Sequence, residues 1–476
     1  MIVLATRAFT AREPPCYELR PGTAMTLDLD RVLDALGPAA RVSYAPPNIY
    51  PMSAPRFTAS SGTERNYPAD RRLGVYVHVP FCSYHCTFCF YATKIGAEAA
   101  EKSRYVAALK RELEWLQEGS LLTQLYVGGG TPTALSPEQL SEVLAAVFGK
   151  VVRDGRHAHT VETSPETLTA EHVDVLRRHG IERVSMGVQS LSDDVLDAVK
   201  RRHTRDMVEE SCRLLLGAGL MLNIDLIYGL PGQEPEGIER DFEYVARLGA
   251  HSVTTYNLRV NERTPVAKTL TADERLDLSK LVRWRSGIAA VAEDLGFGLK
   301  RWHTFHRQEV AGPVGDVVRR FEDVTGQGNQ LGVGNSARSR LNDVIFRNHS
   351  AIDTYVQRVE AGASPVEETF ALSEGERKLR FVTLTLGDGK TLHREAYREA
   401  FGTPVEHDFE EPLIRLSDAG LIEEQQGVIG LTSAGQLLYD LVTRAFYPET
   451  VRRWMEERQS LAASVADRHR PAPAGN

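Results

Sequence analysis

The sequence predicts an α/β protein built on a parallel sheet, and two observations lead to that prediction. Segments that read as strands running into turns recur along the chain, and helical stretches separate them at intervals of about 30 residues, the size of a βα unit. Three of the five cysteines fall in one eight-residue window directly after the first of these strands. Parallel strands carry active sites at their carboxyl ends, so this window marks the edge of the sheet where chemistry is expected.

The strands and helices follow in a regular order. GVYVHVPF, residues 74–81, alternates small and β-branched residues and reads as the first strand. Residues 101–118 read as a helix with one apolar face. LLTQLYVGGGTPTAL, residues 121–135, reads as a strand entering a glycine turn, and Ser136 with Pro137 marks the start of the next helix. Further strand-and-turn units are expected at 158–168, 183–191, 222–233 and 251–260.

The rest of the chain divides into three segments. Residues 1–70 lack a clear periodicity and include a proline-rich stretch, so we expect an N-terminal arm before the α/β domain at 71–345. Residues 346–460 are predicted to form a second module, with three helices, a short hairpin and a further helix. A winged helix has this order, but acidic segments stand where a DNA-binding face would be basic. Residues 461–476 read as a disordered tail.

Composition excludes several classes of function. The chain has 476 residues, 42% of them hydrophobic and 25% charged, which is ordinary for a globular protein. Its net charge of -8 offers no basic field to a nucleic acid. It has no apolar run of about 18 residues for a membrane span and no signal-peptide pattern. Five cysteines do not form a disulfide framework. We therefore expect a cytoplasmic protein. We also expect a monomer that acts on a small molecule.

Cys82, Cys86 and Cys89 form a C-x3-C-x2-C set, one ligand short of a closed metal site. A structural zinc site needs a fourth ligand, and His85 lies between two of the cysteines, where it would strain a tetrahedral arrangement. Inert buried cysteines are the other alternative, but three in eight residues is a high density for that explanation. An iron–sulfur cube held by three thiolates, with one iron open to a ligand, fits the spacing best.

With this motif directly after YVHVPF, residues 76–81, the chain resembles the radical S-adenosylmethionine (SAM) superfamily. It is most similar to the branch of the oxygen-independent coproporphyrinogen III oxidases, the HemN-like branch, over about residues 70 to 460. The resemblance implies a partial (β/α)6, TIM-like barrel at 71–345 and a C-terminal module that covers its mouth. It also implies a [4Fe–4S] cluster on the three cysteines, two SAM molecules, and an electron donor such as flavodoxin or ferredoxin.

The same resemblance implies which residues bind SAM. The first SAM molecule would contact the tyrosine six residues before the first cysteine, the glycine turn and a glutamate at a strand end. The aromatic residue directly before the third cysteine would pack against adenine or a second SAM molecule. A second SAM molecule would contact a glutamine, an arginine and an aspartate further along, and weaker matches imply backbone contacts near two arginines. In this sequence these positions are Tyr76, Phe88, Gly129, Gly130, Thr131, Glu162, Gln189, Arg201, Asp225, Arg259 and Arg338.

The residue types suit such roles. A glycine turn lets the backbone approach a ligand closely, because no Cβ intervenes. The guanidinium of Arg201 can pair with a carboxylate as a bidentate fork. Asp225 stands between Ile224 and Leu226, so its carboxylate needs a partner if it is buried. No catalytic residue is assigned; Tyr91, Tyr256 and His303 are candidates for the final proton transfer.

One departure from the family guides the prediction of the reaction. Coproporphyrinogen III oxidases have a fourth cysteine two residues after the third, where this chain has Tyr91. We therefore predict a class C radical SAM methyltransferase that methylates or cyclopropanates an sp2 carbon of a natural-product intermediate. No cysteine follows Cys212, and too few residues precede the cysteine window for a cobalamin domain, which excludes other methyltransferase classes. The alternatives are oxidative decarboxylation of coproporphyrinogen III and a haem chaperone, with His303 and His306 as candidate haem ligands.

Overall fold

The computed structural model describes residues 72–453 apart from 261–263, 272–273, 302 and 323–327, together with 58–60, Val32 and Leu36. The predicted tail and most of the predicted arm therefore lie outside the described residues. Within the arm, Val32 and Leu36 are buried in the main core. The short strand β1 (Thr58–Ala59) pairs antiparallel with β16 (Val366–Ala371), so this part of the arm joins the sheet edge.

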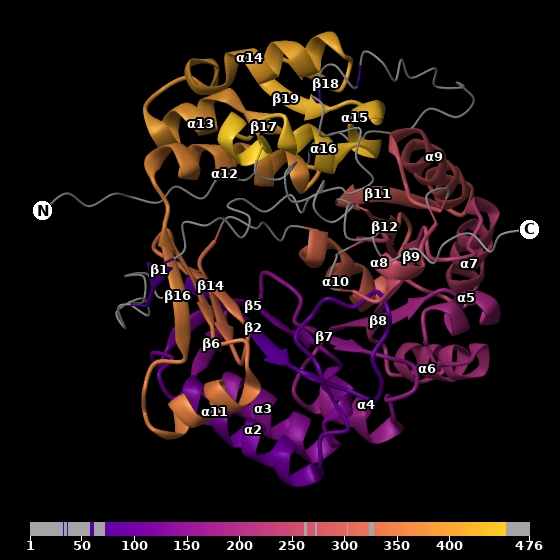
Figure 1. Ribbon diagram of the computed structural model, residues 1–476, viewed down its shortest axis with the longest axis vertical. Coiled ribbons are helices and arrows are strands. Elements are labelled where there is room, and N and C mark those ends of the chain that lie inside the picture. The colour runs from indigo at the N-terminus through magenta and orange to yellow at the C-terminus, as the bar shows by residue number, and fades with distance from the viewer. Residues whose placement is uncertain are drawn as a thin grey trace, which may run out of the picture.

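A 14-stranded sheet forms the centre of the molecule (Figure 1). Neighbouring parallel strands make up its middle, and it ends in β1 and β11 instead of closing on itself. Six of the parallel strands, β2 to β10, lie side by side in chain order, which confirms the predicted partial (β/α)6 barrel. In sheet order the parallel strands are β13 (Gln330–Val333), β2 (Arg72–Val79), β5 (Ser120–Gly129), β7 (Thr160–Thr163), β8 (Arg183–Gln189), β9 (Met221–Tyr228) and β10 (Ser252–Asn257).

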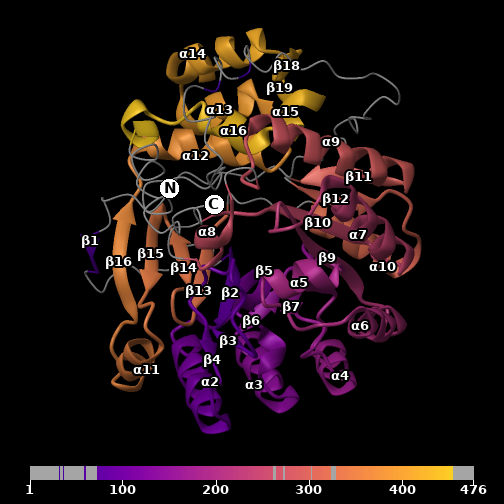
Figure 2. The same ribbon diagram turned by 45° about the vertical axis from the view of Figure 1, so that its right-hand side comes forward.

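Helices connect the parallel strands and cover their outer face (Figures 1 and 2). The side chain of Ser136 caps α3 and Pro137 is its first residue, as predicted. Helix α2 ends at Leu113, five residues short of the predicted end at 118, because tight backbone hydrogen bonds at Trp115 and Leu116 close the turn. The helices are α2 (Ala99–Leu113), α3 (Pro137–Phe148), α4 (Ala170–Arg178), α5 (Asp193–Ala198), α6 (Arg205–Gly217), α7 (Pro235–Arg247), α8 (Val266–Thr269), α9 (Leu278–Asp294) and α10 (Gly312–Glu322).

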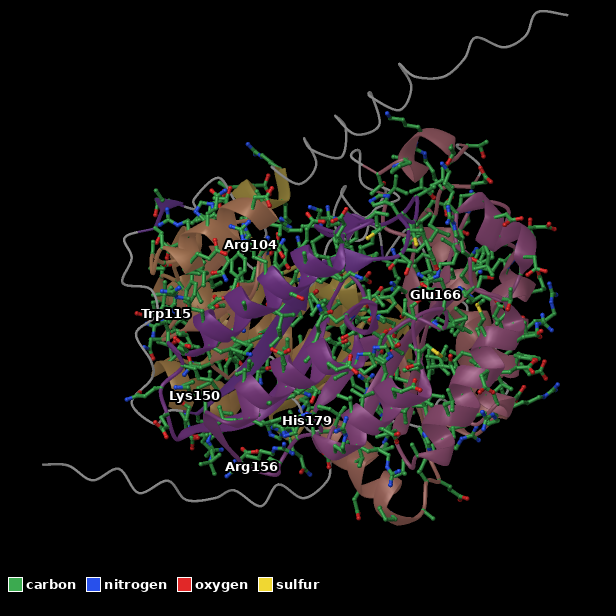
Figure 3. The ribbon with its side chains drawn as sticks, turned by 90° about the horizontal axis from the view of Figure 1, so that it is seen from below. Arg104, Trp115, Lys150, Arg156, Glu166 and His179 are labelled. Atoms are coloured by element: carbon green, nitrogen blue, oxygen red, sulfur yellow. The ribbon has the colours of Figure 1, made fainter. Side chains whose placement is uncertain are left out.

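In the view from below, polar side chains extend from the outer layer of helices (Figure 3). Arg104 on α2 pairs with Glu360 at the end of α11 (Ile352–Glu360). His179, the residue after α4, bonds to Ser141 of α3 at 2.8 Å. These contacts connect neighbouring helices across the surface. In the described part of the chain, no helix is long and apolar enough to cross a membrane.

Antiparallel strands extend the sheet at both ends. At one end β12 (Thr304–Arg307) pairs with β10 and β11 (Phe297–Arg301), and at the other β14 (Arg338–Leu341), β15 (Val344–Asn348) and β16 follow β13. The sheet thus continues to Ala371, beyond residue 345, where the sequence interpretation ended the barrel domain. Antiparallel strands need no crossover helix, so the alternation of strands and helices that marked the barrel is missing here.

The C-terminal module has the predicted order of three helices, a hairpin and further helices, and lies at the top of the molecule beside α9 (Figures 1 and 2). Its three strands form a separate small sheet in the order β17, β19, β18. The elements are α12 (Glu374–Gly387), β17 (Leu392–His393), α13 (Arg394–Phe401), α14 (Val405–Asp418), β18 (Ile422–Gln425), β19 (Val428–Leu431), α15 (Ser433–Leu437) and α16 (Tyr439–Arg444).

A buried ion pair joins this module to the barrel. Arg285 of α9 donates to both carboxylate oxygens of Asp440 on α16, at 2.9 and 3.0 Å. Its Nε donates to the hydroxyl of Tyr228 on β9 at 2.7 Å. The two side chains are 8% and 2% exposed. Burial would raise the pKa of Asp440, but Arg285 outweighs it and holds that pKa below its ordinary value. The module is thereby fixed over the carboxyl end of β9.

Breaking this pair should destabilise the protein strongly. Asp440→Asn leaves the Arg285 charge buried without its counter-ion, so the free energy of unfolding in urea should fall by about 3–5 kcal/mol. Arg453→Ala is the matched control, because it removes an exposed ion pair with Glu449 and should cost less than about 1 kcal/mol. Equal losses in the two variants would show that the Arg285–Asp440 pair does not hold the module.

Candidate active site

The carboxyl ends of the barrel strands and the cysteine loop face one cavity of about 430 Å³. Residues in or just after β5, β7, β8, β9 and β10 line one side, and residues of the segment 82–93 line another. The C-terminal module contributes Tyr439 and Asp440. Most of the residues predicted to bind the cluster or SAM line this cavity, namely Cys82, Cys86, Phe88, Cys89, Gly129, Gly130, Thr131, Glu162, Gln189, Arg201, Asp225 and Arg259.

Two residues predicted to bind SAM are not among those lining the cavity. Tyr76 lies on β2, where its hydroxyl bonds to the His78 imidazole at 2.9 Å and its ring stacks on Tyr126. Arg338 is an exposed residue at the start of β14. The chain turns after β13 ends at Val333, and β14 runs back antiparallel. Arg338 thus follows the turn at the carboxyl end of β13, and the backbone contact that the resemblance implies there stays a prediction.

Backbone hydrogen bonds fix the cysteine loop to the barrel. The N–H of Thr87 donates to the carbonyl of Val199 at 3.1 Å, and the N–H of Val266 donates to the carbonyl of Thr87 at 3.0 Å. Directly after Thr87, Phe88 packs against an apolar cluster that includes Val199, Val266 and Leu258. The loop therefore has a defined position relative to the strand ends.

The three cysteines have different surroundings. Cys86 is buried and accepts a hydrogen bond from Arg201 Nη1 at 3.6 Å. The Sγ atom of Cys82 lies 3.6 Å from the hydroxyl of Thr131. Burial raises the pKa of Cys82 to about 11 and raises that of Cys89. Without a metal, the thiols of Cys82 and Cys89 are therefore held protonated, and coordination to iron would release these protons.

These residues fit a [4Fe–4S] cluster better than a zinc ion. Among the described residues, no three His, Cys, Asp or Glu side chains converge closely enough to hold one metal ion. In a cube each thiolate binds its own iron, so the three sulfurs need not meet at one point. The remaining described cysteine, Cys212 on α6, is buried in the main core. Cys82, Cys86 and Cys89 are thus the residues that would hold the cluster.

The glycine turn after β5 is shaped by close contacts. Gly129 has φ +118°, and a Cβ there would lie 2.6 Å from the His78 ring. The N–H groups of Gly129, Gly130 and Thr131 all bond within the protein, to Glu162, Val79 and Phe81 at 3.2, 2.7 and 2.8 Å. The turn therefore offers carbonyl oxygens to a ligand, which suits the ammonium of SAM better than its carboxylate.

Two carboxylates lie on the wall of the cavity. Glu162 accepts hydrogen bonds from the Tyr126 hydroxyl at 2.6 Å and from the Gly129 N–H. Burial, with the nearby charge of Asp225, raises the pKa of Glu162 to about 7. Asp225 accepts hydrogen bonds from the side chains of Ser185 and Asn223 at 2.9 and 2.8 Å. These are the partners that a buried carboxylate between two apolar residues was expected to need. Burial also raises the Asp225 pKa.

Gln189 and Arg201 stand beside the cysteine loop. Gln189 has φ +71°, rare for a residue other than glycine, and the register with β9 shifts there. Arg201 donates to His203, Ser164, the carbonyl of Gly187 and Cys86. Four of its five N–H groups are thus used within the protein. The predicted fork to a SAM carboxylate cannot form while Arg201 keeps these partners.

The sequence predicted only some of the residues on the far wall of the cavity. Tyr91, Tyr256 and His303, the candidates for proton transfer, all line it. The ring of His303 lies 4.3 Å from that of Tyr256, and its Nδ1 bonds to the hydroxyl of Tyr439. Tyr439 and Asp440 were missed because they lie in a later module whose local pattern is that of an ordinary helix. No sequence signal connects them to the cysteines.

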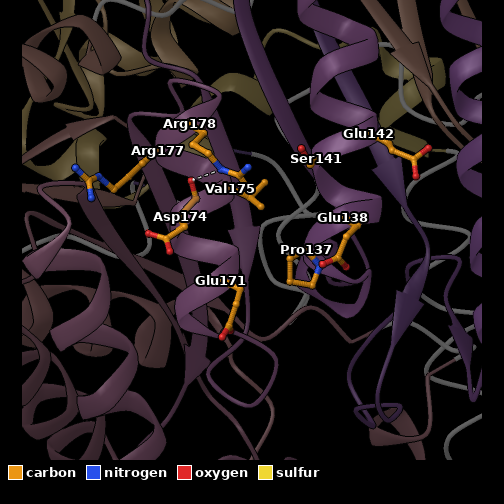
Figure 4. Close-up of a pocket in the computed structure, with 9 residues that line it drawn as sticks. All are labelled: Pro137, Glu138, Ser141, Glu142, Glu171, Asp174, Val175, Arg177 and Arg178. Carbon is orange, nitrogen blue, oxygen red and sulfur yellow. Dashed lines mark hydrogen bonds between the residues drawn. The ribbon is translucent and has the colours of Figure 1, made fainter.

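A second hollow, of about 840 Å³, lies between α3 and α4 (Figure 4). Glu138, Glu142, Glu171 and Asp174 give it an acidic lining, and Arg177 and Arg178 stand at its α4 side. It is formed by the outer helices, and none of its lining residues belongs to the strand ends or the cysteine loop. It is a surface groove separate from the candidate site.

Iron binding tests the cluster assignment. Reconstituted protein should hold about four irons per chain, and Cys86→Ala should hold almost none, because one of three thiolates is lost. Cys212→Ala is the control and should keep its iron, since this buried thiol lies outside the loop. Iron and sulfide are measured by colorimetric assay. Recovery of stoichiometric zinc without sulfide would contradict the assignment.

The pKa of Glu162 predicts a pH dependence of stability. Its folded-state pKa of about 7 lies above the ordinary value of 4.5, so the folded chain holds this proton where the unfolded chain has lost it. The stabilisation is complete below pH 4.5 and is lost as the pH rises through 7. Relative to Glu162→Gln, wild-type protein without cluster or SAM should lose about 2 kcal/mol between pH 5 and 8 in urea denaturation. A difference that stays constant would show that Glu162 titrates normally.

Known proteins share both the fold and the sequence pattern. A family model described as the radical SAM superfamily matches residues 76–245. The chain is 30% identical over 402 residues to an oxygen-independent coproporphyrinogen III oxidase of Pseudomonas aeruginosa, covering 79% of this chain and 86% of the relative. It is 26% identical over 382 residues to the haem chaperone HemW of Bacillus subtilis, covering 79% and 99%.

Among solved structures, the coproporphyrinogen III oxidase of Escherichia coli superposes with a TM-score of 0.71 at 24% identity, covering 79% of this chain and 90% of that one. This match supports the barrel and the C-terminal module. The relatives named here are coproporphyrinogen oxidases and a haem chaperone, so they favour the alternatives over the predicted methyltransferase. The chain belongs to the radical SAM superfamily, in the branch of the oxygen-independent coproporphyrinogen III oxidases and their HemW relatives.

Proposed function

We propose that this radical SAM enzyme oxidatively decarboxylates a carboxylate-bearing side chain of a reduced tetrapyrrole such as coproporphyrinogen III. The observation that carries the proposal is the 30% identity to a coproporphyrinogen III oxidase over 86% of that relative's length. This alignment of 402 residues extends well beyond the part of the chain that matches the superfamily model.

The residues of the cavity have distinct tasks in such a reaction. When bound, the cluster and SAM supply a 5′-deoxyadenosyl radical that abstracts a hydrogen atom from the substrate, and a one-electron acceptor would take the electron released as carbon dioxide leaves. Cys82, Cys86 and Cys89 would hold the cluster, and the guanidinium of Arg201 beside Cys86 offsets thiolate charge. The carbonyls of the glycine turn and the carboxylate of Glu162 would accept hydrogen bonds from SAM. We further propose a flavodoxin or ferredoxin as electron donor.

The C-terminal module would help to shield this chemistry. Tyr439 and Asp440 form part of the cavity lining, and the Arg285 ion pair keeps them in place. Radical intermediates need protection from side reactions, and a fixed cover limits the access of solvent. This use of the module agrees with its acidic segments, which would oppose binding to DNA.

Transfer of a methyl or methylene group from a second SAM molecule is the second candidate. The observation in its favour is Tyr91, which takes the position of the family's fourth cysteine and stacks on Phe90 with ring centroids 4.8 Å apart. These rings and Tyr256 give the cavity flat apolar surfaces that suit an aromatic substrate. In this alternative Gln189 and Asp225 would bind the second SAM molecule, without a fork from Arg201.

Haem transport has less support from the site. Of its two candidate ligands, His303 lines the cavity but shares its Nδ1 with Tyr439. His306 lies on β12 and is 1% exposed, so its imidazole does not face a haem-sized ligand. A haem chaperone would need one of these rings to be released.

Methyl-deuterated SAM distinguishes the candidates. Reconstituted protein is incubated without oxygen with coproporphyrinogen III, a reductant and the labelled SAM. Decarboxylation should yield carbon dioxide and 5′-deoxyadenosine without deuterium, and Cys86→Ala should yield neither. Deuterium in 5′-deoxyadenosine together with S-adenosylhomocysteine would instead establish methyl transfer. Stoichiometric haem binding without any substrate-dependent turnover would favour the chaperone.

A further inference from the structure

Arg259 places a positive charge on the wall of the cavity, on the side away from the glycine turn. It follows β10, two residues after the strand ends at Asn257, and its side chain is partly buried. Along the sheet, β10 is four strands from β5, which carries the glycine turn. Arg259 therefore stands across the cavity from the residues expected to hold the methionine end of SAM.

The guanidinium of Arg259 is not used in the described part of the protein. Among the described residues, no group makes a hydrogen bond or an ion pair with it. Its charge acts on Tyr91 of the cysteine loop and on Tyr439 and Asp440 of the module. Arg259 thus lies where the cysteine loop and the module approach each other.

The other arginines at the site have partners. Arg201 is bonded to Ser164, Gly187, His203 and Cys86. Arg285 binds both oxygens of Asp440, so that carboxylate acts on Arg259 through its charge alone and makes no hydrogen bond with it. A partly buried guanidinium on a cavity wall is a good site for a planar anion, because it offers paired N–H donors.

We propose that Arg259 binds a carboxylate of the substrate and thereby selects polycarboxylate substrates; this inference rests on the proposed function. The anchored carboxylate is one that stays on the substrate, because an arginine ion pair stabilises a carboxylate and would oppose its loss as carbon dioxide. The substrate therefore carries a second carboxylate besides the one that is removed. Tyr439, bonded to His303, lies on the same wall and offers a neutral polar group beside the anchor.

Binding of coproporphyrin III tests the anchor without requiring turnover. The probes are coproporphyrin III, its fully methyl-esterified form and SAM alone, each titrated anaerobically into reconstituted wild-type, Arg259→Gln and Arg259→Lys proteins. Arg247→Gln is the control, since that arginine lies on α7 with a side chain 69% exposed and pairs with Glu243. Fluorescence quenching measures porphyrin binding, and calorimetry measures SAM binding.

Arg259→Gln should weaken binding of the free acid by about tenfold to a hundredfold, while its affinity for the ester and for SAM stays at the wild-type value. Arg259→Lys should lie between, because lysine keeps the charge but not the fork. The inference is overturned if wild-type protein binds acid and ester equally, or if Arg259→Gln loses affinity for SAM instead, which would assign the guanidinium to the methionine carboxylate. Failure of the proposed function would appear separately, as a wild-type enzyme that binds the acid but releases no carbon dioxide from coproporphyrinogen III.

Discussion

The site depends on the close approach of the glycine turn to the cysteine loop. The N–H of Thr131 donates to the carbonyl of Phe81, and the N–H of Gly130 donates to that of Val79, at 2.8 and 2.7 Å. A Cβ on Gly130 would lie 2.7 Å from the Phe81 oxygen and 3.0 Å from the Cys82 sulfur. Since any side chain there would push the two segments apart, this contact places the cysteine thiols and the turn predicted to bind SAM at one edge of the sheet.

Buried charge is balanced around the same edge. Burial raises the pKa of Glu162 and of Asp225, while the charge of the buried Arg183 lowers the pKa of both. Arg201 and Arg285 are held in place by several partners each. In a setting of low polarity such groups interact strongly, so the arrangement positions hydrogen-bond donors and acceptors before any ligand arrives. Among the described residues, Arg259 on this wall keeps its guanidinium without a hydrogen-bond partner, and the proposed selection of carboxylates rests on it.

Local patterns in the sequence were sufficient for the barrel. Its strands alternate or run as apolar segments into turns, and each parallel pair is separated by a helix, so order and direction follow from short-range signals. The cysteine spacing likewise identified the loop. The same reasoning placed the end of the barrel at residue 345, because the antiparallel strands up to Ala371 lack helical crossovers.

The parts that were missed depend on long-range packing. Nothing local to Arg201 shows that Ser164 and Gly187 occupy its guanidinium. The position of Tyr439 at the cavity depends on an ion pair between its neighbour Asp440 and Arg285, which is distant in sequence. The choice among reactions is a further step, because related barrels support different chemistry through small changes in the cavity.

The central claim is that three thiolates leave one iron open to SAM in the cavity beside the glycine turn. The most direct measurement is the EPR spectrum of reduced, reconstituted protein before and after addition of SAM carrying ¹⁵N in its amino group, with hyperfine coupling read by ENDOR. The account predicts a [4Fe–4S]⁺ signal whose g-values shift on addition of SAM and that shows coupling to ¹⁵N. A spectrum that SAM leaves unchanged, without such coupling, would contradict it.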